Sequence, residues 1–443
     1  MNKKRLIGGA IALAAAAGVC LLWHCAESTE SNAIRLHLNG KQHVPDFYAA
    51  KLDRNGSGTV DRMDYIKAKL HAVFSGDAAL YPAYFTADQA KQLGRTAFHP
   101  ETGTLWCSLS GSGIAFRFYG RECTLCLTAD SAYTGGDTVA ARYAVYLNDA
   151  LITDAQLLEQ EQSVTLVNPA DEDTPAQVRL VKLSESAQSS LGIREICVAS
   201  SKRIYQKYHD DLLAPAEAKP HLIEFIGDSI TCGYGVDGQN GVDPFKTANE
   251  NVTKSYAYLT AETLNADYSM VSYSGHGIIS GYTTNGKALT SQLVPRYYAQ
   301  TGHSTAVIES RHKIQDDIWD FKKQPDLIVI NLGTNDSSYT GTDAAKQKDF
   351  AKAYTEFLKV VREKNPDAPI LCTLGIMGQT LCDAVELAVT DYTNETGDTG
   401  IRTLRFDMQS EADGVVVDWH PSAVTHKKAA DKLSGFVRDW LGW

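Results

Sequence analysis

The sequence lacks the basic surface that a nucleic-acid-binding protein needs. Its 443 residues include 42 lysines and arginines against 53 aspartates and glutamates, which gives a formal net charge of -11 at pH 7. The basic residues are also scattered along the chain rather than gathered in clusters. Because attraction to phosphates needs concentrated positive charge, this balance argues against a nucleic acid as a partner.

The N-terminus lacks a clean Ala-x-Ala cleavage site but otherwise has the parts of an export signal. Lys3-Lys4-Arg5 precedes an apolar stretch of 18 residues, Leu6 to Trp23, which is the lower limit for a membrane-spanning helix. We therefore predict that residues 1–25 direct export, so that the protein is secreted or anchored at the cell surface. A cleaved signal peptide, a retained membrane anchor and lipid modification of Cys20 remain alternatives.

The cysteines offer no complete set of pairs. Two of the nine, Cys20 and Cys25, lie in the export region, which leaves seven beyond it. An odd number in an exported chain requires a free thiol or a bond to another chain. Cys123 and Cys126 stand three apart in an alternating stretch, where strand geometry directs them to opposite faces. This spacing argues against a shared metal site and favours small buried side chains.

Residues 26–90 form a polar lead-in with a calcium-loop pattern at 53–64. Oxygen-bearing side chains occupy loop positions 1, 3, 5, 9 and 12, and Gly58 stands at position 6, where the loop turns sharply. The predicted Ca²⁺ ligands are Asp53, Asn55, Ser57, Thr59 through its carbonyl, Asp61 and Asp64. The alternative is a solvated turn without an ion. The segment resembles one half of a dockerin, but the stretch from Arg35 to Lys51 has no second loop, which argues against attachment to a cohesin scaffold.

Two domains of different class follow the lead-in. Residues 91–210 contain short alternating runs separated by turn residues, which predicts an antiparallel β-sandwich. From residue 218 to 443, continuous apolar runs alternate with longer helical segments. This second pattern predicts an α/β domain whose parallel sheet is covered on both faces, and whose ligands bind beyond the carboxyl ends of the strands.

Three polar motifs in this second domain supply what a serine nucleophile needs. Gly227-Asp228-Ser229 directly follows an apolar run, and Gly333-Thr334-Asn335-Asp336 and Asp418-Trp419-His420-Pro421 come later. A serine hydroxyl attacks an acyl group when a base takes its proton and donors receive the oxyanion. The motifs therefore predict a serine hydrolase. The nucleophile-elbow fold is disfavoured, because the serine does not stand in Gly-x-Ser-x-Gly.

These motifs, together with Ser274-Gly275-His276-Gly277, resemble the SGNH or GDSL hydrolases. The order of sandwich and hydrolase domain is similar to carbohydrate esterase family 2, over about residues 91–443. The resemblance implies a three-layer αβα hydrolase domain preceded by a jelly-roll-like sandwich. It further implies Ser229 as nucleophile, His420 as base, and an oxyanion hole made by the backbone N–H groups of Ser229 and Gly275 and the side-chain amide of Asn335.

Three neighbouring residues are further candidates for the site. His276 and Trp419 are candidates for substrate contact, although a surface histidine without such a role is the alternative for His276. The wider superfamily places an acid three residues before the histidine, where this chain has Val417. Asp418 lies two residues before and, on an extended segment, would share a face with His420 and orient its imidazole. A backbone carbonyl in the orienting role is the alternative.

The resemblance implies an esterase that removes O-acetyl groups from plant cell-wall polysaccharides such as xylan or mannan. The reaction would pass through an acyl-enzyme and need no cofactor for catalysis. Two other functions remain open, a carbohydrate-binding protein with an inactive hydrolase domain and a hydrolase of lipids or small esters. No apolar lid-like segment stands beside the motifs, which argues against long-chain lipids.

Overall fold

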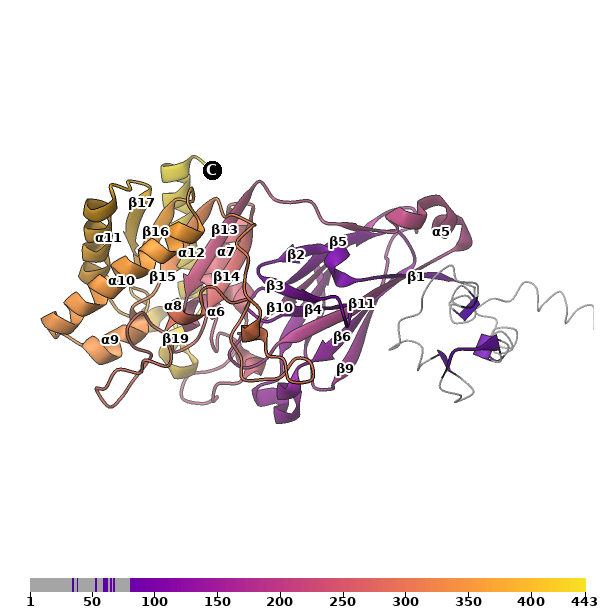
Figure 1. The fold of residues 1–443 in the computed structure, drawn as a ribbon, viewed down its shortest axis with the longest axis horizontal. Coiled ribbons are helices and arrows are strands. Elements are labelled where there is room, and N and C mark those ends of the chain that lie inside the picture. Colours follow the sequence, from indigo (N-terminus) through magenta and orange to yellow (C-terminus); the bar gives the residue numbers. More distant parts are fainter. Residues whose placement is uncertain are drawn as a thin grey trace, which may run out of the picture.

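We describe the fold from a computed structural model, in which two domains lie side by side (Figure 1). The structure describes residues 80–443 continuously and, before them, only residues 34, 35, 38, 52, 53, 59–62, 64, 65 and 67. The predicted export segment, residues 1–25, lies outside the described residues. Within the described part of the chain, no helix is both long and apolar enough to cross a membrane.

The first domain is a sandwich of two six-stranded sheets whose paired strands are antiparallel. One sheet has the order β3-β4-β11-β6-β9, with β1 paired to β11, and the other has the order β12-β5-β10-β7-β8, with β2 paired to β5. The strands of the first sheet are β1 (Tyr81–Phe85), β3 (Thr96–His99), β4 (Thr104–Cys107), β6 (Glu122–Ala129), β9 (Glu161–Val167) and β11 (Leu191–Ser200). Those of the second are β2 (Lys91–Leu93), β5 (Gly113–Phe118), β7 (Arg142–Leu147), β8 (Ala150–Gln156), β10 (Ala176–Lys182) and β12 (Leu213–Pro215).

Alternation of inward and outward side chains builds the sandwich core. Phe116, Leu125 and Tyr143 are among the fully buried side chains between the two sheets. The sandwich extends beyond the expected bounds of 91–210, because β1 adds to one sheet before them and β12 adds to the other after them. Short edge strands such as these carry too few residues for a clear alternating pattern.

The second domain has a five-stranded parallel sheet in the order β14-β13-β15-β16-β17. The strands are β13 (His221–Gly227), β14 (Ala266–Ser272), β15 (Leu327–Asn331), β16 (Ile370–Leu374) and β17 (Ile401–Arg405). The larger helices are α7 (Tyr256–Thr263), α10 (Ala344–Lys364), α11 (Cys382–Thr396) and α12 (Ala423–Leu441). Shorter helices of this domain are α6 (Ser229–Cys232), α8 (Val294–Tyr297) and α9 (Thr334–Thr340), and β18 (Val415–Val416) pairs with β19 (His420–Pro421). The short helix α5 (Lys202–Tyr208) follows β11 and packs on the sandwich instead (Figure 1).

Helices cover both faces of this parallel sheet. Helices α10 and α11 pack with Ile328 and Ile330 in one core, whereas α7 and α12 pack with Val329 on the opposite face. All five residues of β15 are buried, as a strand covered on both faces requires. The expected three-layer αβα domain behind a β-sandwich is therefore confirmed. The seven cysteines beyond residue 25 are all buried and free, which confirms the interpretation of Cys123 and Cys126 as small buried side chains.

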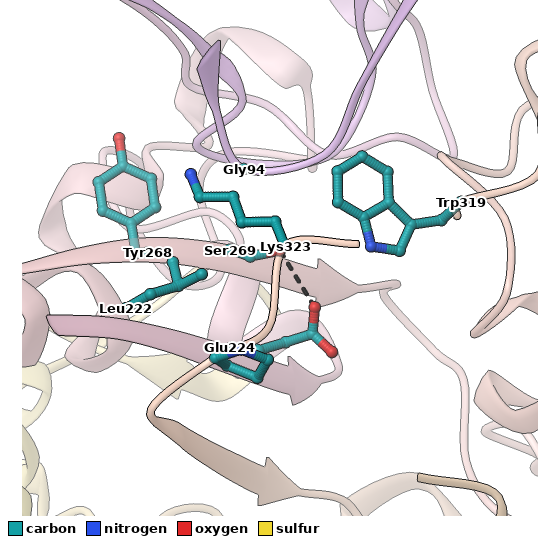
Figure 2. Close-up of a pocket in the computed structure, with 8 residues that line it drawn as sticks. Gly94, Leu222, Glu224, Tyr268, Ser269, Trp319 and Lys323 are labelled. Carbon is teal, nitrogen blue, oxygen red and sulfur yellow. Dashed lines mark hydrogen bonds between the residues drawn. The ribbon is translucent and has the colours of Figure 1, made fainter. Parts of the chain in front are cut away.

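A buried ion pair joins the two domains at their seam. The Arg95 guanidinium, which is 0% exposed, comes from the sandwich and lies 3.0 Å from the Glu224 carboxylate of β13. Figure 2 shows a small cavity beside Glu224, with Gly94 of the sandwich lying over Glu224 and Ser269 of the parallel sheet. Its volume of about 10 Å³ leaves room for one water molecule at most, so the seam is closely packed around this ion pair.

Candidate active site

Ser229 stands at the carboxyl end of the strand β13, at the first position of helix α6. The Asp228 carboxylate accepts a hydrogen bond from the Ile230 N–H at 3.0 Å and so caps the helix. A Cβ atom on Gly227 would lie 2.1 Å from Oγ1 of Thr231, so the turn between strand and helix requires glycine there. The backbone N–H of Ser229 belongs to the first turn of the helix, where N–H groups lack intrahelical acceptors and can serve an anion.

His420, which stands near the C-terminal end of the hydrolase domain, lies next to Ser229 in the structure. Its Nε2 atom is 2.8 Å from Oγ of Ser229, although 191 residues separate the two in the chain. Burial lowers the pKa of His420 below the usual 6.5, so the imidazole is neutral at pH 7 and able to accept a proton. This is the geometry of a nucleophile with its general base.

The imidazole is oriented by a backbone carbonyl. Nδ1 of His420 lies 3.1 Å from the carbonyl oxygen of Val417, so Nδ1 carries the proton and Nε2 is left to accept from the serine hydroxyl. The carboxylate of Asp418 instead accepts a hydrogen bond from the Tyr234 hydroxyl at 2.9 Å. The expected contact of Asp418 with the imidazole is therefore absent from this geometry.

The backbone conformation explains why Asp418 points elsewhere. Its φ is 52° and that of Trp419 is 62°, so both residues adopt the left-handed conformation, which is uncommon for side chains with a Cβ atom. The expectation that Asp418 and His420 share a face assumed an extended segment. The tight turn removes that relationship, and it brings the Val417 carbonyl to the imidazole instead.

The three expected oxyanion donors line one cleft. Ser229, Gly275 and Asn335 all border a cavity of about 700 Å³, together with His420. Asn335 is the second residue of α9, and its side-chain amide donates to the His276 carbonyl at 2.8 Å. This bond fixes the plane of the amide, and the same nitrogen makes a longer hydrogen bond of 3.4 Å to the carboxylate of Asp228, the residue before the nucleophile. A carbonyl carbon bound to Ser229 would place its oxygen among these donors.

Buried carboxylates hold the loop that carries Gly275. Asp336 accepts hydrogen bonds from the N–H groups of Ile278, Ile279 and Ser280 at 2.8 to 3.0 Å. Glu185, which comes from the sandwich, accepts from the Ser274 N–H at 2.8 Å, one residue before Gly275. The sandwich therefore contributes directly to the position of Gly275, a predicted oxyanion donor. Sequence reasoning missed Glu185, because no local motif surrounds it and its partner is 89 residues away.

His276 and Trp419 differ in their relation to the cleft. His276 is only 4% exposed and does not line the cleft, and its ring packs against Tyr297 and His303. The expected rim or surface position is therefore wrong for His276, whose backbone carbonyl holds Asn335 instead. Trp419 lines the cleft and is 58% exposed, as a substrate-contacting side chain requires.

The remaining wall of the cleft is partly aromatic. Tyr234, Tyr282 and Met377 line it beside Trp419, and Tyr282 is also 58% exposed. No sequence motif marks these three side chains, because they come from separate loops that only the fold brings together. An open cleft with aromatic walls suits a polar ring substrate better than a buried acyl chain.

The predicted calcium loop is only partly described. Asn55 and Ser57 lie outside the described residues. Asp61 and Asp64 accept hydrogen bonds from each other's backbone N–H groups, at 3.3 and 2.8 Å, where the helix after the loop begins. This reciprocal arrangement caps a helix and is compatible with a loop ending at Asp64.

Two family models match the two domains. The GDSL-like lipase/acylhydrolase family matches residues 225–428, and the carbohydrate esterase 2 N-terminal domain matches residues 92–207. These ranges contain Ser229, Asn335 and His420 in the first and most of the sandwich in the second.

Three similar proteins are named as esterases. A cellulase/esterase CelE of Acetivibrio thermocellus is 32% identical over 79% of this chain, which spans 39% of that relative. An acetylxylan esterase / glucomannan deacetylase of Cellvibrio japonicus is 28% identical over 66% of this chain and 74% of the relative. A solved family two carbohydrate esterase from Clostridium thermocellum, in complex with cellohexaose, has a TM-score of 0.65 and 27% identity over 82% of this chain and 100% of that one.

The second domain thus belongs to the GDSL-like lipase/acylhydrolase family, and the first is a carbohydrate esterase 2 N-terminal domain. The same pair of domains is matched by the solved family two carbohydrate esterase. The resemblance inferred from the four motifs is confirmed.

Proposed function

We propose that this protein is an exported serine esterase that removes O-acetyl groups from xylan, mannan or a related plant cell-wall polysaccharide. The observation that carries the proposal is the bond of 2.8 Å between Ser229 Oγ and His420 Nε2 at the edge of an open cleft. The names of the relatives, acetylxylan esterase and glucomannan deacetylase, support the choice of substrate.

The reaction begins when Ser229 Oγ attacks the acetyl carbonyl carbon. His420 Nε2 takes the hydroxyl proton, and the oxyanion receives hydrogen bonds from the N–H groups of Ser229 and Gly275 and from the Asn335 amide. When the tetrahedral intermediate collapses, His420 returns the proton to the sugar oxygen, which leaves as a hydroxyl. Water, activated by His420, then attacks the acetyl-enzyme and releases acetate. No step requires a metal ion.

We assign the orienting role to the Val417 carbonyl, so that the enzyme acts through a Ser229–His420 dyad. Asp418 supports the dyad from a distance, because its negative charge raises the pKa of His420 against the effect of burial. This electrostatic support favours the imidazolium that forms in the transition state. The contact of Asp418 with Tyr234 also holds the turn that presents Trp419 to the cleft.

The shape of the cleft favours a polysaccharide over a lipid. Trp419 and Tyr282 offer exposed ring faces, on which a sugar ring stacks with its C–H groups. An acetyl group is small enough for the space beside Ser229, whereas a long acyl chain requires a continuous apolar groove. The lining of this cleft includes Ser274, Thr334, Ser337 and Ser338, which make that side polar.

Acetate release from a substrate panel tests this function. The purified chain should release acetate from acetylated xylan or acetylated mannan, and it should hydrolyse a long-chain ester much more slowly. Ser229→Ala provides the control for spontaneous deacetylation. A faster reaction with the long-chain ester would favour a lipid hydrolase. Retention on acetylated polysaccharide without any acetate release would favour a binding protein with an inactive hydrolase domain.

We further propose that the loop 53–64 binds Ca²⁺ and that residues 1–25 direct export, with secretion or surface anchoring as the two outcomes. Replacement of Asp53 and Asp64 by Ala should abolish calcium heat in calorimetry while leaving the esterase rate nearly unchanged, because the loop lies far from the cleft motifs in the chain. Absence of calcium heat in the unmodified protein would end the calcium proposal. Binding to a cohesin would be measured in the same calcium-loaded protein, and the single loop predicts none.

A further inference from the structure

Two histidines and two carboxylates converge where the domains meet, away from the catalytic cleft. His99 ends strand β3 of the sandwich, whereas Glu309, His312 and Asp317 belong to the long connection between β14 and β15 of the hydrolase domain. Nε2 of His99 lies 3.2 Å from one oxygen of Asp317, and Nε2 of His312 lies 3.0 Å from the other. None of the four residues lines the cleft around Ser229.

The spacing of these atoms fits a single small metal ion. A nitrogen or oxygen ligand lies about 2.0–2.2 Å from zinc, so two ligands of a tetrahedral site are separated by roughly 3.3 Å. The two measured separations from Asp317 are close to that value. One ligand atom from each of His99, His312 and Asp317 lies within 4.8 Å of the other two, and the imidazole rings meet edge to face with centroids 4.9 Å apart.

Glu309 provides the outer partner that a metal-binding histidine usually has. Its carboxylate lies 2.9 Å from Nδ1 of His99, on the side of the ring opposite Asp317. It is held in place by the Thr102 hydroxyl at 2.7 Å and by the Trp106 indole N–H at 2.9 Å. Such a carboxylate fixes the ring orientation, keeps the proton on Nδ1 and leaves Nε2 to bind a metal.

The negative charge of the cluster also favours a bound cation. With neutral imidazoles, Glu309 and Asp317 leave two negative charges on partly buried side chains. A divalent cation between the two Nε2 atoms and Asp317 supplies the balancing charge and displaces the protons that otherwise bridge them.

We propose that His99, His312 and Asp317 bind a divalent transition-metal ion, for which zinc is the best match, with Glu309 orienting His99. Two imidazoles and one carboxylate suit Zn²⁺ better than Ca²⁺ or Mg²⁺, which prefer oxygen ligands. A water molecule completes four ligands. The ion links the sandwich to the connection that also contains Ser274 and Gly275, so its role is to fasten the two domains rather than to take part in ester hydrolysis.

Zinc titration of the full chain tests this site, with calcium present in excess to occupy the separate loop at 53–64. The unmodified protein should bind one equivalent of Zn²⁺ and gain thermal stability from it. His99→Ala and His312→Ala should each lose this binding, and Glu309→Gln should weaken it by about 10- to 100-fold, as the loss of an outer partner does elsewhere. His209→Ala is the matched control, because His209 is an exposed histidine paired with a carboxylate outside the cluster.

Cobalt provides a readout that does not depend on the fold of the alanine variants. Co²⁺ bound to the unmodified protein should give the intense visible bands of tetrahedral nitrogen and oxygen coordination. Asp317→Asn keeps the size of the side chain and should remove those bands while the protein stays folded by circular dichroism. Failure of the unmodified protein to bind Zn²⁺, or equal binding by His99→Ala and His312→Ala, would overturn the proposal and leave the cluster as a proton-bridged contact.

Discussion

The catalytic cleft and the seam between the domains both bury ionisable side chains, but they partner them differently. In the seam, the Glu224 carboxylate accepts from Arg95, from the Tyr298 hydroxyl and from Ser269, so each charge is surrounded by partners. In the cleft, His420 has one bond at each ring nitrogen, and one of these leads to the Ser229 hydroxyl beside open space. The hydrogen bonds around Glu224 form a closed network that stabilises the fold. The hydrogen bonds from Val417 through His420 to Ser229 end beside open space, so this chain of bonds can pass a proton.

The largest effect on activity should come from breaking the hydrogen bond between Ser229 and His420 in the cleft. Ser229→Ala and His420→Ala should each reduce kcat by about 10⁵- to 10⁶-fold, because the nucleophile and the base act as one unit. The double variant should be no slower than either single one. Melting temperatures should stay close to that of the unmodified protein, since neither side chain supports the core. Acetate release under substrate saturation measures the rates, and additive losses in the double variant would contradict a joint role.

Breaking the hydrogen-bond network around Glu224 in the seam should instead reduce stability. Arg95→Ala should lower the free energy of unfolding by about 3–5 kcal/mol, because it leaves the Glu224 carboxylate buried without its counter-charge. Arg117→Ala is the control, since this sandwich arginine is half exposed and its carboxylate partner lies 4.0 Å away; it should cost less than about 1 kcal/mol. Urea unfolding followed by fluorescence measures both. Equal losses of unfolding free energy in the two variants would mean that the buried ion pair stabilises the protein no more than an exposed one does.

Much of the cleft could be predicted from the sequence, whereas the seam could not. Ser229 and Asn335 stand just after apolar strands, in short motifs whose chemistry can be recognised locally. Arg95 and Glu224 are 129 residues apart, and neither stands in a motif. Glu185 was missed for the same reason, although it holds the loop that carries Gly275.

The errors within the cleft have a local physical cause. The expected contact of Asp418 with the imidazole depends on an extended backbone. Asp418 and Trp419 instead have positive φ values, and because neither residue is glycine, the sequence carries no sign of this turn. His276 was expected at the rim, although burial among the rings of Tyr297 and His303 depends on a loop between strands whose course the sequence does not show.

Removal of one oxyanion donor should have a smaller effect than loss of the nucleophile. Asn335→Ala should reduce kcat by roughly 10²- to 10³-fold with little change in KM, because its amide meets charge that develops only in the transition state. Steady-state kinetics on a soluble acetyl ester separates the two constants. A change in KM alone would make Asn335 a substrate-binding residue.

The smallest effect on rate should come from Asp418. Asp418→Ala should lower kcat by less than roughly tenfold, because the Val417 carbonyl already fixes the imidazole tautomer. The carboxylate raises the pKa of His420, so its removal should lower that pKa further and move the acidic fall in activity to lower pH. The pH profile of kcat/KM measures the shift. A loss of 10²-fold or more would restore a triad.

The account rests on an acetyl group passing through Ser229, and trapping that intermediate tests it most directly. The protein would be mixed with an activated acetyl ester, quenched in acid within the first turnover, digested and analysed by mass spectrometry. The peptide that contains Ser229 should carry one acetyl group in the unmodified protein and none in Ser229→Ala. Acetate release in the first turnover without any acetyl group on that peptide would contradict the covalent mechanism.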